Sequence, residues 1–209
     1  MILGLEFSSA IRSAALLDGN VVIARVEASD HSAPVLLLER LFQQAELPVT
    51  KINSIIVGLG PGSYTGIRSS LALAQGWQLG RNIPVEGVSS AELIAFQAWH
   101  GGVRNVATVV IDAQRGDVYK ADYEFAESGF RALGELAIMP ANALSTDAKL
   151  IGPEATKWNV MGTTIVPDAA HLNQVLGVAL PSGAANLLEP IYLRETNFIK
   201  AAPSKRNFE

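Results

Sequence analysis

The chain has 209 residues, of which 49% are hydrophobic and 17% charged, and its formal net charge is −4. This composition predicts one or two folded domains with a sizeable core, and it argues against autonomous nucleic-acid binding, which needs a basic surface. The absence of cysteine excludes disulfides, a thiolate zinc site and a cysteine nucleophile. Because the start lacks signal-peptide features and no apolar run approaches ~18 residues, we expect a soluble cytoplasmic protein without a membrane segment.

Apolar runs bounded by turn residues predict strands that precede helices in each half of the chain. Expected strands cover Ile2–Phe7, Arg12–Asp18, Val21–Val26, Ile55–Val57, Ile83–Val88, Asn105–Asp112, Asp117–Phe125, Phe130–Ile138, Leu150–Gly152 and Thr163–Val166. Expected helices cover Pro34–Leu47, Ile67–Gly80, Ala91–Trp99 and Ala169–Leu180. This order indicates the α/β class with mixed sheets.

Two of the expected helices are unusually apolar. Between Ile67 and Gly80 the only charged residue is Arg68, and the apolar residues of Pro34–Leu47 span more than one helix face. An ordinary surface helix has a charged stripe opposite its core stripe. Each helix is therefore either buried inside its domain or carries a second apolar face for a partner, and the pattern leaves both open.

A glycine-rich loop, Gly60–Gly66, joins a strand to the second of these helices. Ser63 or Thr65 is expected to cap the helix, whose free N–H groups would suit an anion. The loop is not a P-loop, because Ile67 stands where a lysine is needed. The spacing of the glycines differs by one residue from that of a dinucleotide-binding fingerprint. Pro61 also lacks the backbone N–H that a phosphate would need there. The pattern favours a tight turn that fixes strand against helix.

The two halves of the chain open in the same way, with Glu6 and Asp112 in matching places after an apolar strand. This weak internal repeat and the pair Gly101-Gly102 predict two domains, 1–100 and 101–209. The two acids would hold a metal–nucleotide pair if both strands ended at one cleft. The alternative is that each is a solvated residue at a strand end.

No other side chains form a recognisable chemical group. The three histidines, His31, His100 and His171, do not stand at metal-ligand spacing from one another. No serine elbow or nameable triad occurs. From the residues we therefore predict no catalytic residue, no metal ligand and no cofactor-binding residue.

Three motifs together resemble one family. Gly60-Pro61-Gly62-Ser63-Tyr64-Thr65-Gly66-Ile67-Arg68 resembles the GPGSFTGLR signature of the TsaB (YeaZ) family. Ile111 to Tyr119 is similar to that family's DARRGEVY segment, and Tyr192-Leu193-Arg194 matches near the end. The resemblance covers nearly the whole chain and is loosest between about Glu127 and Gln174. One departure is Glu6-Phe7, where the family usually has Asp-Thr, and it weakens any role in phosphate binding.

The resemblance implies a duplicated actin/Hsp70-like (ASKHA) fold with two subdomains, the tail from about 190 packing back on the first. It implies a non-catalytic, cofactor-free subunit that pairs with TsaD in making threonylcarbamoyladenosine on tRNA. TsaE joins the larger complex, tRNA is reached through the complex, and a homodimer is an option. Pairing uses the two unusually apolar helices. The expected partner-interface residues are Leu37, Leu38, Leu41, Phe42, Ile67, Ser70, Leu71, Ala74, Trp77 and Gln78.

Two alternatives from other classes remain. One is a metal-dependent, glycoprotease-like peptidase, and the other is an ASKHA nucleotide-binding enzyme similar to a sugar kinase. The interface hypothesis itself predicts that Leu41→Glu or Leu71→Glu leaves the monomer folded but abolishes TsaD binding.

Overall fold

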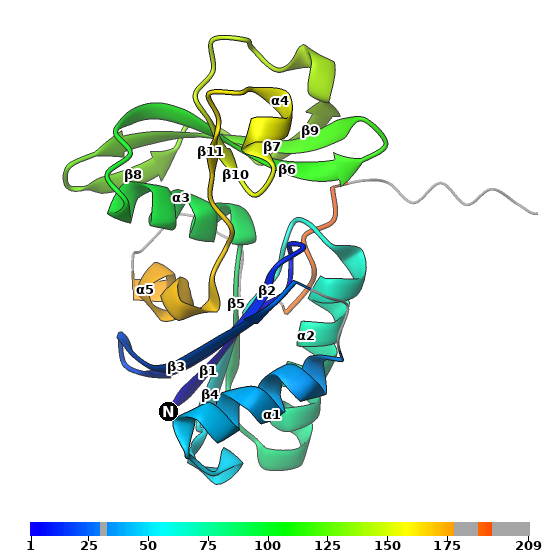
Figure 1. Cartoon of the computed structure of the whole chain (residues 1–209), viewed down its shortest axis with the longest axis vertical. Helices are drawn as coiled ribbons and strands as arrows, with labels where there is room; N and C mark the ends of the chain where they lie inside the picture. The colour runs from blue at the N-terminus through cyan, green and yellow to red at the C-terminus, as the bar shows by residue number, and fades with distance from the viewer. Residues whose placement is uncertain (30–32, 178–187, 194–209) are drawn as a thin grey trace, which may run out of the picture.

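The computed structural model describes residues 1–29, 33–177 and 188–193. The described residues form two β-sheets, one above the other in Figure 1, with helices between them and on the outer face of the first. His31, Ser32, Arg194 and the basic tail residues lie outside the described residues.

The first sheet has the strand order β3-β2-β1-β4-β5. Its strands are β1 (Ile2–Glu6), β2 (Arg12–Asp18), β3 (Val21–Ala28), β4 (Ser54–Gly58) and β5 (Val85–Val88). The three N-terminal strands form an antiparallel meander, and β4 and β5 add to β1 in parallel. Leu3 lies opposite Leu16 on one side and Ile55 on the other, so the centre of the sheet is apolar.

The second sheet repeats this arrangement, with the order β8-β7-β6-β10-β11. Its strands are β6 (Asn105–Gln114), β7 (Asp117–Ala126), β8 (Gly129–Ala132), β9 (Ala137–Pro140), β10 (Leu150–Gly152) and β11 (Thr163–Thr164). Again an antiparallel meander is followed by two parallel strands. Matching order and directions confirm a duplicated, actin/Hsp70-like α/β fold. The domain boundary after residue 100 stays a prediction.

The single strand expected over Phe130–Ile138 is interrupted. Its two parts, β8 and β9, lie along the same edge of β7 and pair with opposite ends of it. Four residues, 133–136, stand opposite only two residues of β7, so the extra residues bulge out of the ladder.

The helices differ in length between the two halves. They are α1 (Pro34–Ala45), α2 (Tyr64–Arg81), α3 (Ser90–His100), α4 (Ala155–Trp158) and α5 (Leu172–Gly177), with 3-10 turns η1 (Val49–Lys51), η2 (Ala141–Ala143) and η3 (Ala169–His171). The helix expected over Ala169–Leu180 is η3 followed by α5, and residues 178–180 lie outside the description. The long α2 follows β4, whereas its counterpart after β10 is the short α4.

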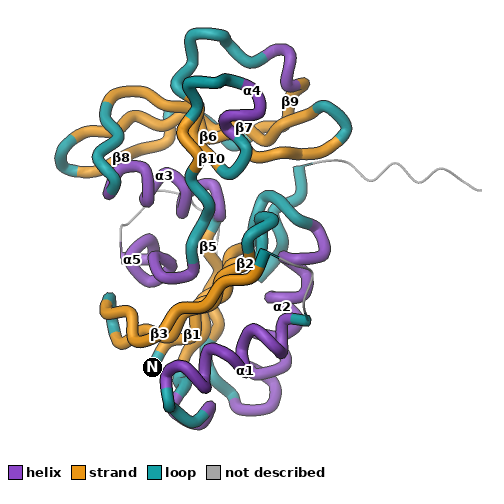
Figure 2. Tube along the Cα trace, in the orientation of Figure 1, coloured by secondary structure: helices purple, strands orange, loops and turns teal. Residues whose placement is uncertain are grey.

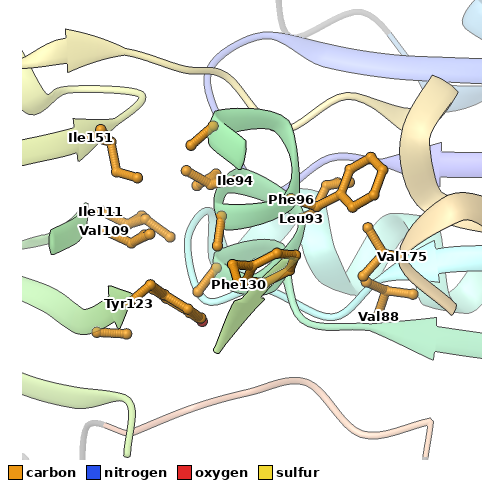
Figure 3. Packing of buried hydrophobic residues seen from close by; sticks show 14 of the residues in the cluster. Val88, Leu93, Ile94, Phe96, Val109, Ile111, Tyr123, Phe130, Ile151 and Val175 are labelled. Carbon is orange, nitrogen blue, oxygen red and sulfur yellow. The ribbon is translucent and has the colours of Figure 1, made fainter. Parts of the chain in front are cut away.

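The helices divide the interior into separate cores. Helices α1 and α2 cover the outer face of the first sheet and enclose one core with it, as the tube in Figure 2 shows. The space between the two sheets holds α3 and α5 and the largest core. There Phe96 of α3 meets Phe130 of the second sheet, and Val88 and Val175 lie beside each other (Figure 3). Each half therefore depends on the other to bury its inner face.

Candidate functional site

The glycine-rich loop packs on the loop that follows β1. The Ser63 hydroxyl accepts a hydrogen bond from the Gly66 N–H at 3.2 Å, which confirms Ser63 as the cap of α2. The Ser63 N–H donates to the Ser8 carbonyl at 2.6 Å. Two N–H groups that an anion at this helix start would use are thus satisfied within the chain.

Two glycines of the loop are needed for this close contact. A Cβ at Gly66 would lie 1.9 Å from the Phe7 carbonyl oxygen. A Cβ at Gly62, where φ is +147°, would lie 2.1 Å from the Ser8 carbonyl oxygen. Both neighbours are backbone atoms that cannot move aside, so the glycines serve loop-on-loop packing, as expected of a tight turn.

Glu6 turns into the protein and not toward solvent. Its side chain is fully buried, and its carboxylate accepts hydrogen bonds from the Ser8 N–H at 2.7 Å and the Ser90 hydroxyl at 2.9 Å. Burial raises the pKa of Glu6 above its ordinary value. The interpretation as a solvated strand end was therefore wrong for Glu6. Ser90 is committed to this contact and does not cap α3.

Asp112, at the matching place in the second half, has a different environment. It forms an ion pair with Lys157 at 2.6 Å and accepts a hydrogen bond from the Gln114 N–H at 2.7 Å. The Asp112 N–H donates to Glu154 at 3.3 Å, and burial raises the pKa of Glu154. Both carboxylates of the repeat are thus bound to other groups of the chain.

Two histidines that are far apart in the sequence meet between the sheets. The rings of His100 and His171 have centroids 6.0 Å apart, and each lies 6.0 Å from Phe96. Nδ1 of His171 is 2.8 Å from Oε1 of Gln174. The pair lines a groove of about 440 Å³ beside β11. The spacing of these histidines along the chain gives no sign of the pair, because the fold brings the rings together.

The predicted interface residues mostly lie inside the first half. Seven of the ten are buried against the first sheet: Leu37, Leu38, Leu41, Ile67, Ser70, Leu71 and Ala74. Leu41 and Ile67 are completely inaccessible, and Leu71 is 4% exposed. These side chains form the core stripe of α1 and α2, so a partner cannot contact them in the folded chain. This face of each helix is therefore buried inside its domain, which is the first of the two possibilities that the sequence pattern left open.

The other three predicted residues are half-buried. The rings of Phe42 and Trp77 stack at 6.2 Å, and the Arg81 guanidinium lies 5.5 Å from the Trp77 centroid. Gln78 is also half-buried. The Phe42–Trp77 stack fixes α1 against α2.

The outward faces of both helices carry exposed apolar side chains that are not among the ten predicted interface residues. Leu79 of α2 is 89% exposed, and Val35 and Leu36 of α1 are 66% and 51% exposed. The small exposed residues Ala72 and Gly76 precede Leu79 on α2 by two turns and one turn, and nothing lies within 4 Å of a Cβ placed on Gly76. We call these exposed residues of α1 and α2 together the outer helix face.

Two further features are absent from the described residues. Among them, no group of three or more His, Cys, Asp or Glu side chains could hold a metal ion. No helix in the same part of the chain is long and apolar enough to cross a bilayer.

The duplicated sheets define a class: actin/Hsp70-like α/β proteins built from two related halves. A family model described as TsaD, tRNA N6-adenosine threonylcarbamoyltransferase, matches residues 22–189. The tRNA threonylcarbamoyladenosine biosynthesis protein TsaB of Escherichia coli is 33% identical, over 98% of this chain and 99% of its own. The chain belongs to the TsaB (YeaZ) family.

Further relatives agree with this. TsaB of Bacillus subtilis is 30% identical over 59% of this chain and 55% of its own. The structure of YeaZ from Pseudomonas aeruginosa superposes with a TM-score of 0.73 at 22% identity, covering 92% of this chain and 99% of that one. Another structure from that organism, described as similar to peptidase YeaZ, gives the same TM-score at 23% identity. These two structural likenesses show a shared fold.

Proposed function

We propose that this chain is a non-catalytic dimerisation subunit in the cytoplasmic synthesis of threonylcarbamoyladenosine on tRNA. It pairs with the transferase TsaD and supports it, TsaE joins the larger complex, and tRNA is reached through that complex. Membership of the TsaB family supports the pathway. The contacts of Glu6 and Asp112 support the non-catalytic role, because both carboxylates already have partners within the chain.

The main support for pairing with TsaD is the outer helix face. It replaces the buried stripe as the candidate interface, on the same two helices. Leu79, Val35 and Leu36 expose apolar side chains, whereas Ala72 and Gly76 leave room for another helix to approach closely. Exposed apolar side chains of this kind are typical of protein–protein contacts.

The test compares two exposed apolar residues in different places. Leu79→Glu places a charge on the outer helix face, and Val160→Glu places one on a turn of the second half, where Val160 is 92% exposed. Neither changes a buried side chain, so both variants should fold with unchanged melting temperatures. We expect Leu79→Glu to weaken binding to TsaD of the same organism at least about tenfold in calorimetry, or ~1.4 kcal/mol. Val160→Glu should bind like the parent.

A tRNA threonylcarbamoylation assay with and without the chain completes the test. Modification should depend on the parent chain and fall with Leu79→Glu. Normal TsaD binding by Leu79→Glu would reject the outer helix face. Modification that does not need the chain would reject the supporting role, and metal-dependent hydrolysis of a protein by the isolated chain would favour the peptidase alternative.

A further inference from the structure

The two histidines that meet between the sheets come from elements that are fixed against each other. His100 is the last residue of α3, and His171 is the last residue of η3, directly before α5. Gln97, one turn before His100, donates to the Val166 carbonyl at 3.0 Å and accepts from the Asp168 N–H at 3.1 Å. These bonds hold the segment that leads into η3 against the last turn of α3. The fold therefore sets the separation of the two rings from both sides.

Both imidazole rings have nitrogen atoms that are available to a ligand. Nδ1 of His171 is 2.8 Å from Oε1 of Gln174, and because an amide oxygen can only accept, Nδ1 carries the hydrogen. Nε2 of His171 then keeps its lone pair. Within the described residues, no hydrogen bond involves this Nε2 or either ring nitrogen of His100. A ring N–H that is held by an oxygen is the usual arrangement in a histidine that binds a metal ion through its other nitrogen.

The two rings are close enough to share one ion. Their centroids are 6.0 Å apart. An imidazole nitrogen binds zinc at about 2.0–2.1 Å, so two rings on the same ion have centroids about 5–6 Å apart. The buried ring of Phe96 lies 6.0 Å from each histidine, and both histidines line the groove of about 440 Å³. The groove leaves space for water on the remaining coordination positions of an ion.

We propose that His100 and His171 bind a single divalent transition-metal ion in this groove. Imidazole nitrogen suits zinc, copper and nickel, whereas magnesium and calcium prefer oxygen ligands. The chain has three histidines and no cysteine, so no thiolate competes for such an ion. Two protein ligands are fewer than the four of a structural zinc site, so water completes the coordination. This inference goes beyond the proposed function and does not depend on it.

Copper(II) is the probe that shows the ligands directly. Among the divalent first-row ions it binds nitrogen sites most tightly, and its unpaired electron reports the nitrogen atoms bound to it. One equivalent of Cu²⁺ is added to the full chain, and pulsed electron paramagnetic resonance counts the imidazoles on the ion. We expect two imidazoles on one Cu²⁺, and calorimetry should show a single site.

Four variants separate this site from binding elsewhere on the chain. His100→Phe and His171→Phe keep an aromatic ring beside Phe96 but have no lone pair, so each should lose the two-imidazole signal and the single-site heat. Gln174→Ala frees Nδ1 of His171 and should weaken binding about 10–100-fold while two imidazoles stay on the ion. His31→Ala removes the remaining histidine and should bind like the parent.

Zinc and the folding control complete the test. Zn²⁺ should raise the melting temperature of the parent and not that of the phenylalanine variants, because an ion that binds the folded chain stabilises it. A parent spectrum with one imidazole or none would overturn the site. Unchanged copper binding in both phenylalanine variants, with circular dichroism showing that they are folded, would overturn it as well. If a phenylalanine variant does not fold, the number of imidazoles in the parent spectrum still decides.

Discussion

The Ser90 hydroxyl donates a hydrogen bond to the buried carboxylate of Glu6 at 2.9 Å, which joins the first turn of α3 to the end of β1. The same hydroxyl accepts from the Gly60 N–H at 3.2 Å. Three loops therefore meet at one buried acid. The arrangement makes the stability of the chain dependent on pH and on the close fit of the glycine-rich loop.

Replacing Glu6 with glutamine should change the pH profile of stability. Burial is the main cause of the raised pKa of Glu6, so the folded state binds the proton more tightly than the unfolded state does. The stabilisation that this tighter proton binding gives is fully present below the ordinary glutamate pKa of 4.5. It is lost as the pH rises through the higher pKa of Glu6 in the folded state. Glu6→Gln should therefore be more stable than the parent at pH 7, with the difference shrinking in acid.

Urea unfolding of both proteins over a pH series measures this difference. Glu39→Gln, at an exposed position of α1, controls for the loss of one negative charge. If the unfolding free energies of Glu6→Gln and of the parent changed with pH in parallel, the buried carboxylate would not couple folding to pH.

Alanine at two glycines of α2 should have opposite effects. Gly66→Ala forces a methyl group against the Phe7 carbonyl, and we expect it to cost about 2 kcal/mol or more of unfolding free energy. Gly76→Ala meets open space in the same helix and should stabilise the chain by ~0.5–1 kcal/mol. Thermal and urea unfolding check both, and equal effects would mean that the loop can move away from its neighbour.

Two leucines of α2 should differ sharply when truncated. Leu71 is 4% exposed, so Leu71→Ala should cost ~2–5 kcal/mol. Leu79 is 89% exposed, and Leu79→Ala should change the unfolding free energy by less than about 0.5 kcal/mol. For the same reason Leu71→Glu should unfold the chain, contrary to the sequence-based expectation of a folded monomer. Circular dichroism of the isolated variants decides this.

The ion pair between Arg25 and Asp168 should be worth more than an ordinary surface pair. Arg25 Nε lies 2.7 and 3.0 Å from the two carboxylate oxygens of Asp168, which also caps η3 through the Ala170 N–H at 3.0 Å. Asp168→Ala removes both contacts and should cost ~1–3 kcal/mol. Asp168→Asn keeps a capping oxygen and should cost less.

Urea unfolding at two salt concentrations tests this prediction. The control is Glu124→Ala, which breaks the exposed pair with Arg131 and should cost less than about 1 kcal/mol. Equal losses of unfolding free energy for Asp168→Ala and Glu124→Ala would show that neither the cap of η3 nor the Arg25–Asp168 ion pair between the halves adds stability.

The strands could be predicted well because they are local patterns. The strand over Arg12–Asp18 and the cap at Ser63 both follow from residues next to one another in the chain. The interrupted strand β8–β9 could not be predicted, because its break depends on register against β7. The pairing of His100 with His171 was equally invisible, since the fold alone brings them together.

The sequence by itself determined the elements, the duplication and the family. Apolar periodicity, turn residues and the Gly60–Arg68 signature each consist of residues that are close together in the chain. It also marked α1 and α2 as unusual. Only the tertiary structure decided which face of those helices is free: Leu41 and Leu71 meet the first sheet, and Leu79 meets solvent. Local sequence also placed Glu6 at a strand end, but only the packed loops decided that its carboxylate points inward. Burial depends on what the rest of the chain places against a side chain, and no local pattern contains that information.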